Sequence, residues 1–133
     1  MKYAGTLLTL VLTLALLCTG CANDLIYIVT DGVYTMDTAK EKQEYVPHIS
    51  FDTKDQTFTF SYDMLSSYLN YGSYEIEKDE VIATTSDEKY IYRFEIVDDN
   101  MVSFIAETSH STETVEGIVA VPDHAVFVLG ADK

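Results

Sequence analysis

The stretch QTFTFSY at residues 56–62 alternates polar and aromatic side chains, and KYIYRFEIV at 89–97 repeats the alternation. Successive side chains of an extended chain point to opposite faces, so Phe58, Phe60 and Tyr62 share one face. In the second stretch Tyr90, Tyr92, Phe94 and Ile96 share one face, while Arg93 and Glu95 point the other way. This period of two is typical of antiparallel strands with one face in a core and the other in water.

The same alternation recurs along the chain and predicts eight short strands. They are expected at residues 25–36, 45–51, 56–62, 72–77, 80–85, 89–97, 101–106 and 124–129, and GIVAV at 117–121 is a further candidate. Most connections are short and rich in Asp, Glu, Lys, Ser and Asn, as in hairpin turns. For LIYIV at 25–29 an interfacial membrane contact is the alternative to a strand.

Short strands joined by hairpins predict an all-β fold, a small antiparallel meander that closes or nearly closes into a lipocalin-like barrel. Closure removes exposed sheet edges. A two-sheet β-sandwich is the alternative. An eight-stranded barrel has room for side chains or for one small ligand, and the many aromatic residues favour a filled interior.

One segment, DMLSSYLNYG at 63–72, lacks the strand period and predicts the short helical turn of the fold. Asp63 is a suitable N-cap, and the apolar side chains on one side of the turn are expected to face the core. These side chains are Met64, Leu65, Tyr68 and Leu69. Tyr68 and Tyr71 break the pattern. They form either a surface for stacking on a sugar or peptide or a plug in the barrel end.

The first twenty residues have a different character. Lys2 is followed by LLTLVLTLALL at 7–17, in which threonine is the only polar residue type. Eleven residues are too few for a helix to cross a hydrocarbon core of about 30 Å. A charged start, a short apolar run and small residues indicate a secretory signal peptide.

The residues at the end of this segment, Thr19 and Gly20 before Cys21, resemble the lipobox of bacterial lipoproteins. In that family the cysteine becomes the first residue of the mature chain and carries a thioether-linked diacylglycerol. Cys18 stands where the motif usually has leucine. The resemblance implies lipid attachment at Cys21 and a location on the extracytoplasmic face of the cell membrane. The expected organisation is a signal peptide at 1–20, a short tether at 21–24 and a single β domain at 25–133.

The spacing of the two cysteines also matches a C-x-x-C redox motif or half of a zinc site. A redox motif is expected to open a helix after a strand, and zinc requires further ligands at suitable spacing. Cys18 and Cys21 have neither context, which favours the lipoprotein interpretation.

The chain has 22 acidic and 8 basic residues and a formal net charge of −14. The basic residues are scattered, so we expect no nucleic-acid partner. The acidic residues are expected to form a solvated surface that keeps the domain soluble, with divalent-cation binding as the alternative.

Motifs for catalysis or cofactor binding are not found in the sequence. Serine occurs in neither G-x-S-x-G nor S-x-x-K, and the histidines lack metal-ligand spacing: His48, His110 and His124. His110 lies among glutamates in the polar stretch 107–117, for which a mobile solvated loop is favoured over a weak metal site. We therefore expect no enzyme activity, metal or cofactor.

A longer resemblance covers residues 45–104, in the pieces ISFD, FTFSYD, LSSYL, GSYEI and Y-x-F-x-I. These resemble a small uncharacterised β-domain of Gram-positive bacteria. It occurs in short lipoproteins and as the extracytoplasmic tail of beta-lactam-sensor-type membrane metallopeptidases. The resemblance implies an accessory binding or sensing domain; the H-E-x-x-H motif of the peptidase is absent from this sequence.

The sequence thus predicts a lipid-anchored extracytoplasmic binding or sensing domain without catalysis. Its expected partners are the membrane, through the anchor, and a protein or cell-wall component; the oligomeric state is left open. Tyr68 and Tyr71 are the candidate binding surface. A lipocalin-like carrier, which requires a hollow apolar barrel, and a cell-wall-directed hydrolase, which requires a cleft with a perturbed carboxylate, are the alternatives.

Overall fold

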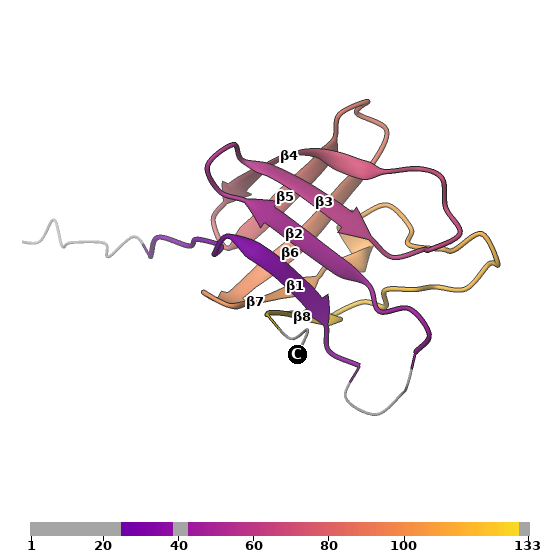
Figure 1. Cartoon of the computed structure of the whole chain (residues 1–133). Coiled ribbons are helices and arrows are strands. Elements are labelled where there is room, and N and C mark those ends of the chain that lie inside the picture. Colours follow the sequence, from indigo (N-terminus) through magenta and orange to yellow (C-terminus); the bar gives the residue numbers. More distant parts are fainter. Residues whose placement is uncertain (1–24, 39–42, 131–133) are drawn as a thin grey trace, which may run out of the picture.

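The computed structural model describes residues 25–38 and 43–130, which form a closed barrel of eight antiparallel strands (Figure 1). The strands are β1 (Gly32–Met36), β2 (His48–Asp52), β3 (Thr57–Ser61), β4 (Asn70–Glu77), β5 (Glu80–Thr85), β6 (Ile91–Asp98), β7 (Met101–Phe104) and β8 (Val126–Leu129). Each strand pairs with the next along the chain, and β8 pairs with β1 to close the barrel. The predicted barrel is confirmed, and the sandwich alternative is wrong.

The first predicted strand is shorter than its sequence pattern indicated. Residues 25–31 precede β1 and belong to no strand, and Leu25, Ile26 and Ile28 are exposed. The extended run is interrupted at Gly32, whose φ of +135° is rarely adopted by other residues. The other weak candidate, GIVAV at 117–121, contributes only an isolated bridge between Glu113 and Val119.

The predicted helical turn at 63–72 is wrong in position. Residues 63–69 form an irregular loop, and residues 70–72 begin β4. Asp63 caps this loop locally, because its Oδ1 accepts the N–H of Leu65 at 2.8 Å. Within the described residues the one short helical element is η2 (Ala106–Thr108), a 3₁₀ turn.

Aromatic side chains fill the barrel interior, as their alternation in the sequence predicts. Phe60 lies at the centre of this cluster and packs against rings from several strands. Its ring-centroid distances are 5.2 Å to Tyr62, 5.0 Å to Tyr92, 5.5 Å to Phe94, 6.2 Å to Phe104 and 6.0 Å to Phe127. These separations are those of favourable edge-to-face and tilted aromatic pairs. The barrel axis is therefore occupied by protein.

The barrel wall includes one position where a side chain has no room. A Cβ added at Gly72 in β4 would lie 2.0 Å from the carbonyl oxygen of Thr84 in β5 and 2.8 Å from the Cα of Thr85. The glycine thus permits a close approach of the two strands.

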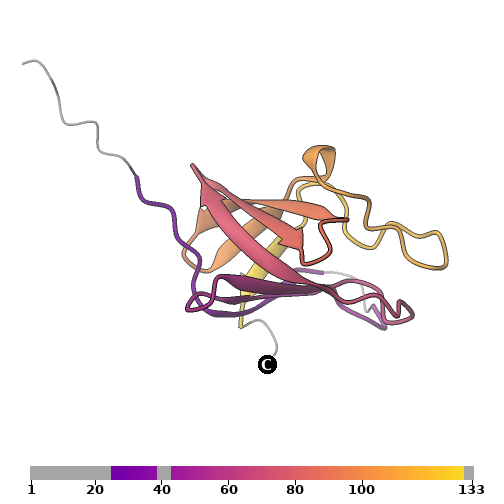
Figure 2. The same ribbon diagram turned by 90° about the horizontal axis from the view of Figure 1, so that it is seen from above.

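The two ends of the barrel have different connections (Figures 1 and 2). We call the end at which the chain enters β1 the entry end; it carries the short turns β2–β3, β4–β5 and β6–β7. The opposite end, here called the loop end, carries the longer connections β1–β2, β3–β4 and β7–β8. This division follows from the strict up-and-down order of the strands.

The entry end is closed by the segment that precedes β1. Val29 is buried, and the N–H of Thr30 donates to the hydroxyl of Tyr34 at 2.9 Å. The Thr30 hydroxyl donates to the carbonyl oxygen of Asp99 at 2.6 Å, which joins this segment to the β6–β7 turn. Asp31 Oδ1 accepts the N–H of Thr53 at 2.9 Å and joins it to the β2–β3 turn.

We predict that Phe60→Ala and Phe94→Ala each lower the free energy of unfolding by about 3–5 kcal/mol, because both side chains are buried among other rings. Urea denaturation measures this loss, which is a large part of the roughly 5–15 kcal/mol of a typical domain. Val97→Ala is the control on the outer face of β6 and is expected to cost less than about 1 kcal/mol. A loss that small for Phe60→Ala would contradict the central position of this ring.

Candidate functional site

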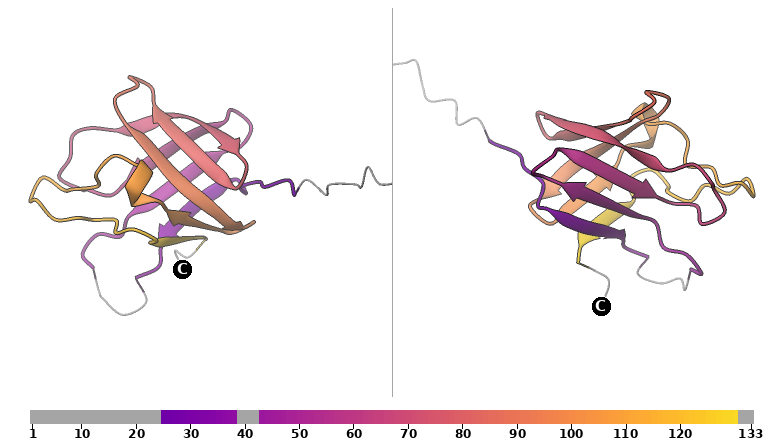
Figure 3. Two further views of the ribbon diagram at one scale, coloured as in Figure 1. Left: turned by 180° about the vertical axis from the view of Figure 1, so that it is seen from behind. Right: turned by 45° about the horizontal axis from the view of Figure 1, so that its top comes forward.

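Three of the segments at the loop end lie next to one another in the fold (Figure 3). They are residues 43–47 before β2, residues 62–69 between β3 and β4, and residues 105–125 between β7 and β8. Residues of all three line one hollow, and residues of the first two also line a second hollow beside it.

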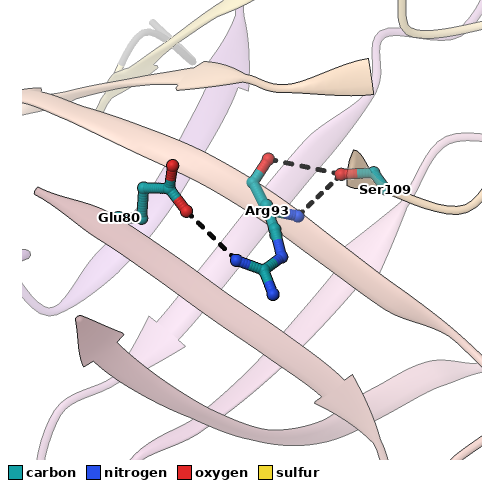
Figure 4. A network of polar contacts seen from close by, with 3 residues as sticks. All are labelled: Glu80, Arg93 and Ser109. Atoms are coloured by element: carbon teal, nitrogen blue, oxygen red, sulfur yellow. Dashed lines mark hydrogen bonds and ion pairs between the residues drawn. The ribbon is translucent and has the colours of Figure 1, made fainter. Parts of the chain in front are cut away.

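The first part of the β7–β8 connection is fastened to the barrel wall. The N–H of Arg93 in β6 donates to Ser109 Oγ at 2.7 Å, while the Arg93 guanidinium pairs with Glu80 of β5 at 3.3 Å (Figure 4). The N–H of Ile91 donates to His110 Nδ1 at 3.0 Å, and the N–H of His110 donates to the carbonyl of Ile91 at 2.9 Å.

The next residues, 112–121, fold back on themselves, and we call them the arm. The N–H of Ala120 donates to the carbonyl of Thr112 at 3.0 Å, and that of Thr114 donates to the carbonyl of Ile118 at 2.8 Å. Gly117, with a φ of +79°, forms the turn. The sequence predicts a mobile solvated loop at 107–117. In the structure this segment remains largely irregular, and several of its polar side chains and amides form hydrogen bonds with backbone groups far away in the sequence.

Asp63 connects the arm to the β3–β4 loop. Its Oδ2 accepts the N–H of Val115 at 2.7 Å across 52 residues of sequence, while its Oδ1 accepts that of Leu65 at 2.8 Å. Hydrogen bonds to an ionised carboxylate are stronger than those between neutral groups. One carboxylate therefore sets the spacing between the two segments.

A groove of about 490 Å³ lies between the arm, residues 43–47 and the start of the β3–β4 loop. Its lining residues are Gln43, Glu44, Tyr45, Pro47, Tyr62, Asp63, Met64, Leu65, Thr114, Glu116, Ile118, Val119 and Ala120. A smaller hollow of about 350 Å³ adjoins it and extends towards Tyr68, with Phe60 and Asn70 among its lining residues.

Large apolar side chains around the groove are exposed to water. Met64, Leu65, Val115, Ile118 and Val119 are between 59 and 71% exposed. They come from the arm and from the β3–β4 loop, the two segments that Asp63 joins. The sequence predicts that Met64, Leu65, Tyr68 and Leu69 face the core. This prediction is wrong for Met64, Leu65 and Leu69, which are exposed because strand side chains already fill the interior.

The two predicted binding residues lie in different places. Tyr68 lines the smaller hollow, is 37% exposed and packs its ring against Tyr90 at 5.1 Å. Tyr71, 45% exposed, lies on β4, where the burial pattern turns alternate side chains outwards. The structure thus brings Tyr68 to the loop end and leaves Tyr71 on the outer wall.

A hydrogen-bonded pair of buried polar groups lies beside the smaller hollow. The Tyr92 hydroxyl donates to Asn70 Oδ1 at 2.8 Å and lies 3.5 Å from the hydroxyl of Tyr62. Burial raises the pKa of Tyr92, and the hydrogen bond to Tyr62 acts in the same direction. Tyr92 is therefore neutral, and its polar atom is satisfied within the protein.

Metal ligands do not gather in the described part of the chain: no group of three or more His, Cys, Asp or Glu side chains is placed to hold an ion. No helix within residues 25–38 and 43–130 has the length and apolar character needed to cross a bilayer. Cys21, the predicted lipid-attachment residue, lies outside the described residues.

Comparison of the chain with protein families, with curated proteins and with solved structures gave no match. The site is therefore interpreted from its own geometry.

We predict that Tyr68→Phe raises the pKa of Asp87 towards its ordinary value of 3.8. In the protein this pKa is lowered, first by the Tyr68 hydroxyl, 2.7 Å from both carboxylate oxygens, and next by that of Thr85. Carboxylate-detected NMR titration measures the midpoint, and Tyr71→Phe is the control expected to leave it in place.

The same hydrogen bond makes a stability contribution with a defined pH dependence. Because the folded-state pKa of Asp87 is depressed, the contribution is complete above the unfolded-state pKa and is lost as the pH falls through the folded-state pKa. The stability difference between wild type and Tyr68→Phe should therefore shrink below pH 3.8. An Asp87 midpoint that is unchanged in Tyr68→Phe would contradict this assignment.

Proposed function

We propose that this protein is a lipid-anchored extracytoplasmic binding domain, without catalysis, that docks a protein partner at the loop end of its barrel. The observation that carries the proposal is the exposed apolar groove between the arm and residues 62–65. Contiguous exposed apolar surface is uncommon on soluble domains and marks interaction sites. Interfaces combine such an apolar centre with a polar rim, and both occur here.

The position of the chain entry supports an anchor on the far side of the barrel. Four residue steps separate Cys21 from Leu25, a reach of at most about 14 Å. Strands of up to eight residues place the loop end at most about 26 Å beyond the entry end. The exposed Leu25, Ile26 and Ile28 come soon after Cys21 in the sequence and suit the apolar side of the bilayer interface. In this orientation the groove faces away from the membrane.

The carrier alternative has less support from the structure. A lipocalin-like carrier holds its ligand on the barrel axis, where this protein places Phe60, Phe94 and Phe127 at ring distances of 5.5 to 6.0 Å.

A hydrolase of the expected kind needs a carboxyl group whose pKa suits proton transfer, whereas the pKa of Asp87 is lowered by neighbouring hydroxyls.

We predict that Cys21→Ser abolishes membrane attachment of the exported protein, because the serine oxygen does not form the thioether to diacylglycerol. Detergent phase partitioning measures the effect: wild type is expected in the detergent phase and the variant in the aqueous phase. Cys18→Ser is the control and is expected to behave like wild type. A processed Cys21→Ser protein that still enters the detergent phase would contradict the lipid anchor.

The docking surface is tested by photocrosslinking in intact cells, with a benzophenone amino acid at Leu65 or Ile118. We expect the same discrete protein adduct from both groove positions and none from Ile76 or Val97, partly exposed apolar residues of the barrel wall. Equal labelling from the wall positions, or none from the groove, would contradict docking at the loop end.

A further inference from the structure

The walls and rim of the groove differ in chemistry, and together they restrict what it can hold. Its apolar walls come from the β3–β4 loop, from the arm and from the segment before β2. Their side chains are Met64, Leu65, Ile118, Val119, Ala120 and Pro47. Apart from the weakly accepting sulfur of Met64, these side chains offer no hydrogen bond, so the walls favour apolar groups. The uncharged polar residues of the lining are Gln43, Tyr45, Tyr62 and Thr114.

The charged residues of the described lining are all acidic: Glu44, Asp63 and Glu116. The chain as a whole carries −14, so the surrounding field has the same sign. Lys40 and Lys42 precede the groove in the sequence and lie outside the described residues. Opposite charge on a ligand is favourable at this rim, and like charge is unfavourable.

The arm also offers backbone hydrogen bonds. Glu113 and Val119 face each other between the bonded pairs Thr112–Ala120 and Thr114–Ile118. This is the non-hydrogen-bonded position of an antiparallel ladder, in which both residues turn their N–H and C=O groups outwards. Val119 lines the groove, and its backbone groups have no hydrogen-bond partner among the described residues. An extended polypeptide supplies such partners.

We propose that the occupant of the groove is an extended polypeptide segment in which apolar side chains alternate with lysine or arginine. The apolar side chains lie against Leu65 and Ile118, and the cations pair with Glu44 and Glu116 at the rim. Asp63 acts as a positioning residue, because its two oxygens hold the arm and the β3–β4 loop at the spacing of the groove. This inference rests on the proposed docking function and adds the chemical class of the partner.

The test uses the full lipidated protein in zwitterionic nanodiscs and three labelled nine-residue peptides, with empty nanodiscs as the blank. The peptides alternate valine with lysine, valine with glutamate, and serine with lysine. Fluorescence anisotropy at physiological ionic strength is expected to show the tightest binding for the valine–lysine peptide. The other two should bind at least about tenfold more weakly, a difference that two or three lost contacts produce.

Matched variants separate the groove from the general acidity of the protein. Glu44→Gln/Glu116→Gln should weaken binding of the valine–lysine peptide by about tenfold. The control Glu75→Gln/Glu77→Gln removes the same charge from exposed positions of β4 and should leave binding within about twofold. Leu65→Ser/Ile118→Ser should abolish binding, and Ile76→Ser/Val97→Ser should not.

The outcomes distinguish the ligand class from the docking function. Tight binding of the valine–glutamate peptide, weakened by Leu65→Ser/Ile118→Ser, would overturn the cationic class and leave docking at the groove in place. Equal weakening by both glutamine variants would show attraction to the overall charge and would overturn the inference. No binding of the valine–lysine peptide would overturn the inference, and the crosslinking result would then decide the docking function separately.

Discussion

The packing of Phe60 against rings from the surrounding strands is the constraint on which the rest of the fold depends. Its neighbours include Tyr92 at 5.0 Å, Phe94 at 5.5 Å and Phe127 at 6.0 Å, so strands β3, β6 and β8 meet on one side chain. A shift of one residue in any strand register would turn its aromatic side chains outwards. The aromatic side chains on the barrel axis therefore fix the strand registers. They also leave the ends of the barrel, rather than its interior, as the place for a ligand.

The two ends then take different roles because the chain enters at only one of them. Short turns and the contacts of Thr30 and Asp31 hold the entry end. The loop end has long connections. Val46, Ala120 and Val121 pack these connections against the core, and single polar residues join them to neighbouring segments. Asp63 and Ser109 each bind backbone of another segment, so the loop end is ordered without being covered.

The sequence predicts the strands well because each strand buries one face, which requires apolar residues at every second position. Phe58, Phe60, Tyr92 and Phe94 are buried as their alternation requires. The loop end was predicted less well because its contacts are not local. The hydrogen bond between Asp63 and Val115 joins residues 52 apart in the sequence. The apolar residues of 63–69 have the spacing of a helix face, and the sequence alone does not show that strand side chains already fill the core.

The acidic residues of the groove also bear on whether its exposed apolar surface would lead to self-association. Two copies that met groove to groove about a two-fold axis would bring the same patch together on both sides. Glu44, Asp63 and Glu116 of one copy would then face the same residues of the other. At an effective dielectric constant of about 20, two like charges 4 Å apart repel by about 4 kcal/mol, which opposes self-association. The same three carboxylates attract a cationic segment. They therefore disfavour binding of a second copy of the protein and favour binding of a basic partner.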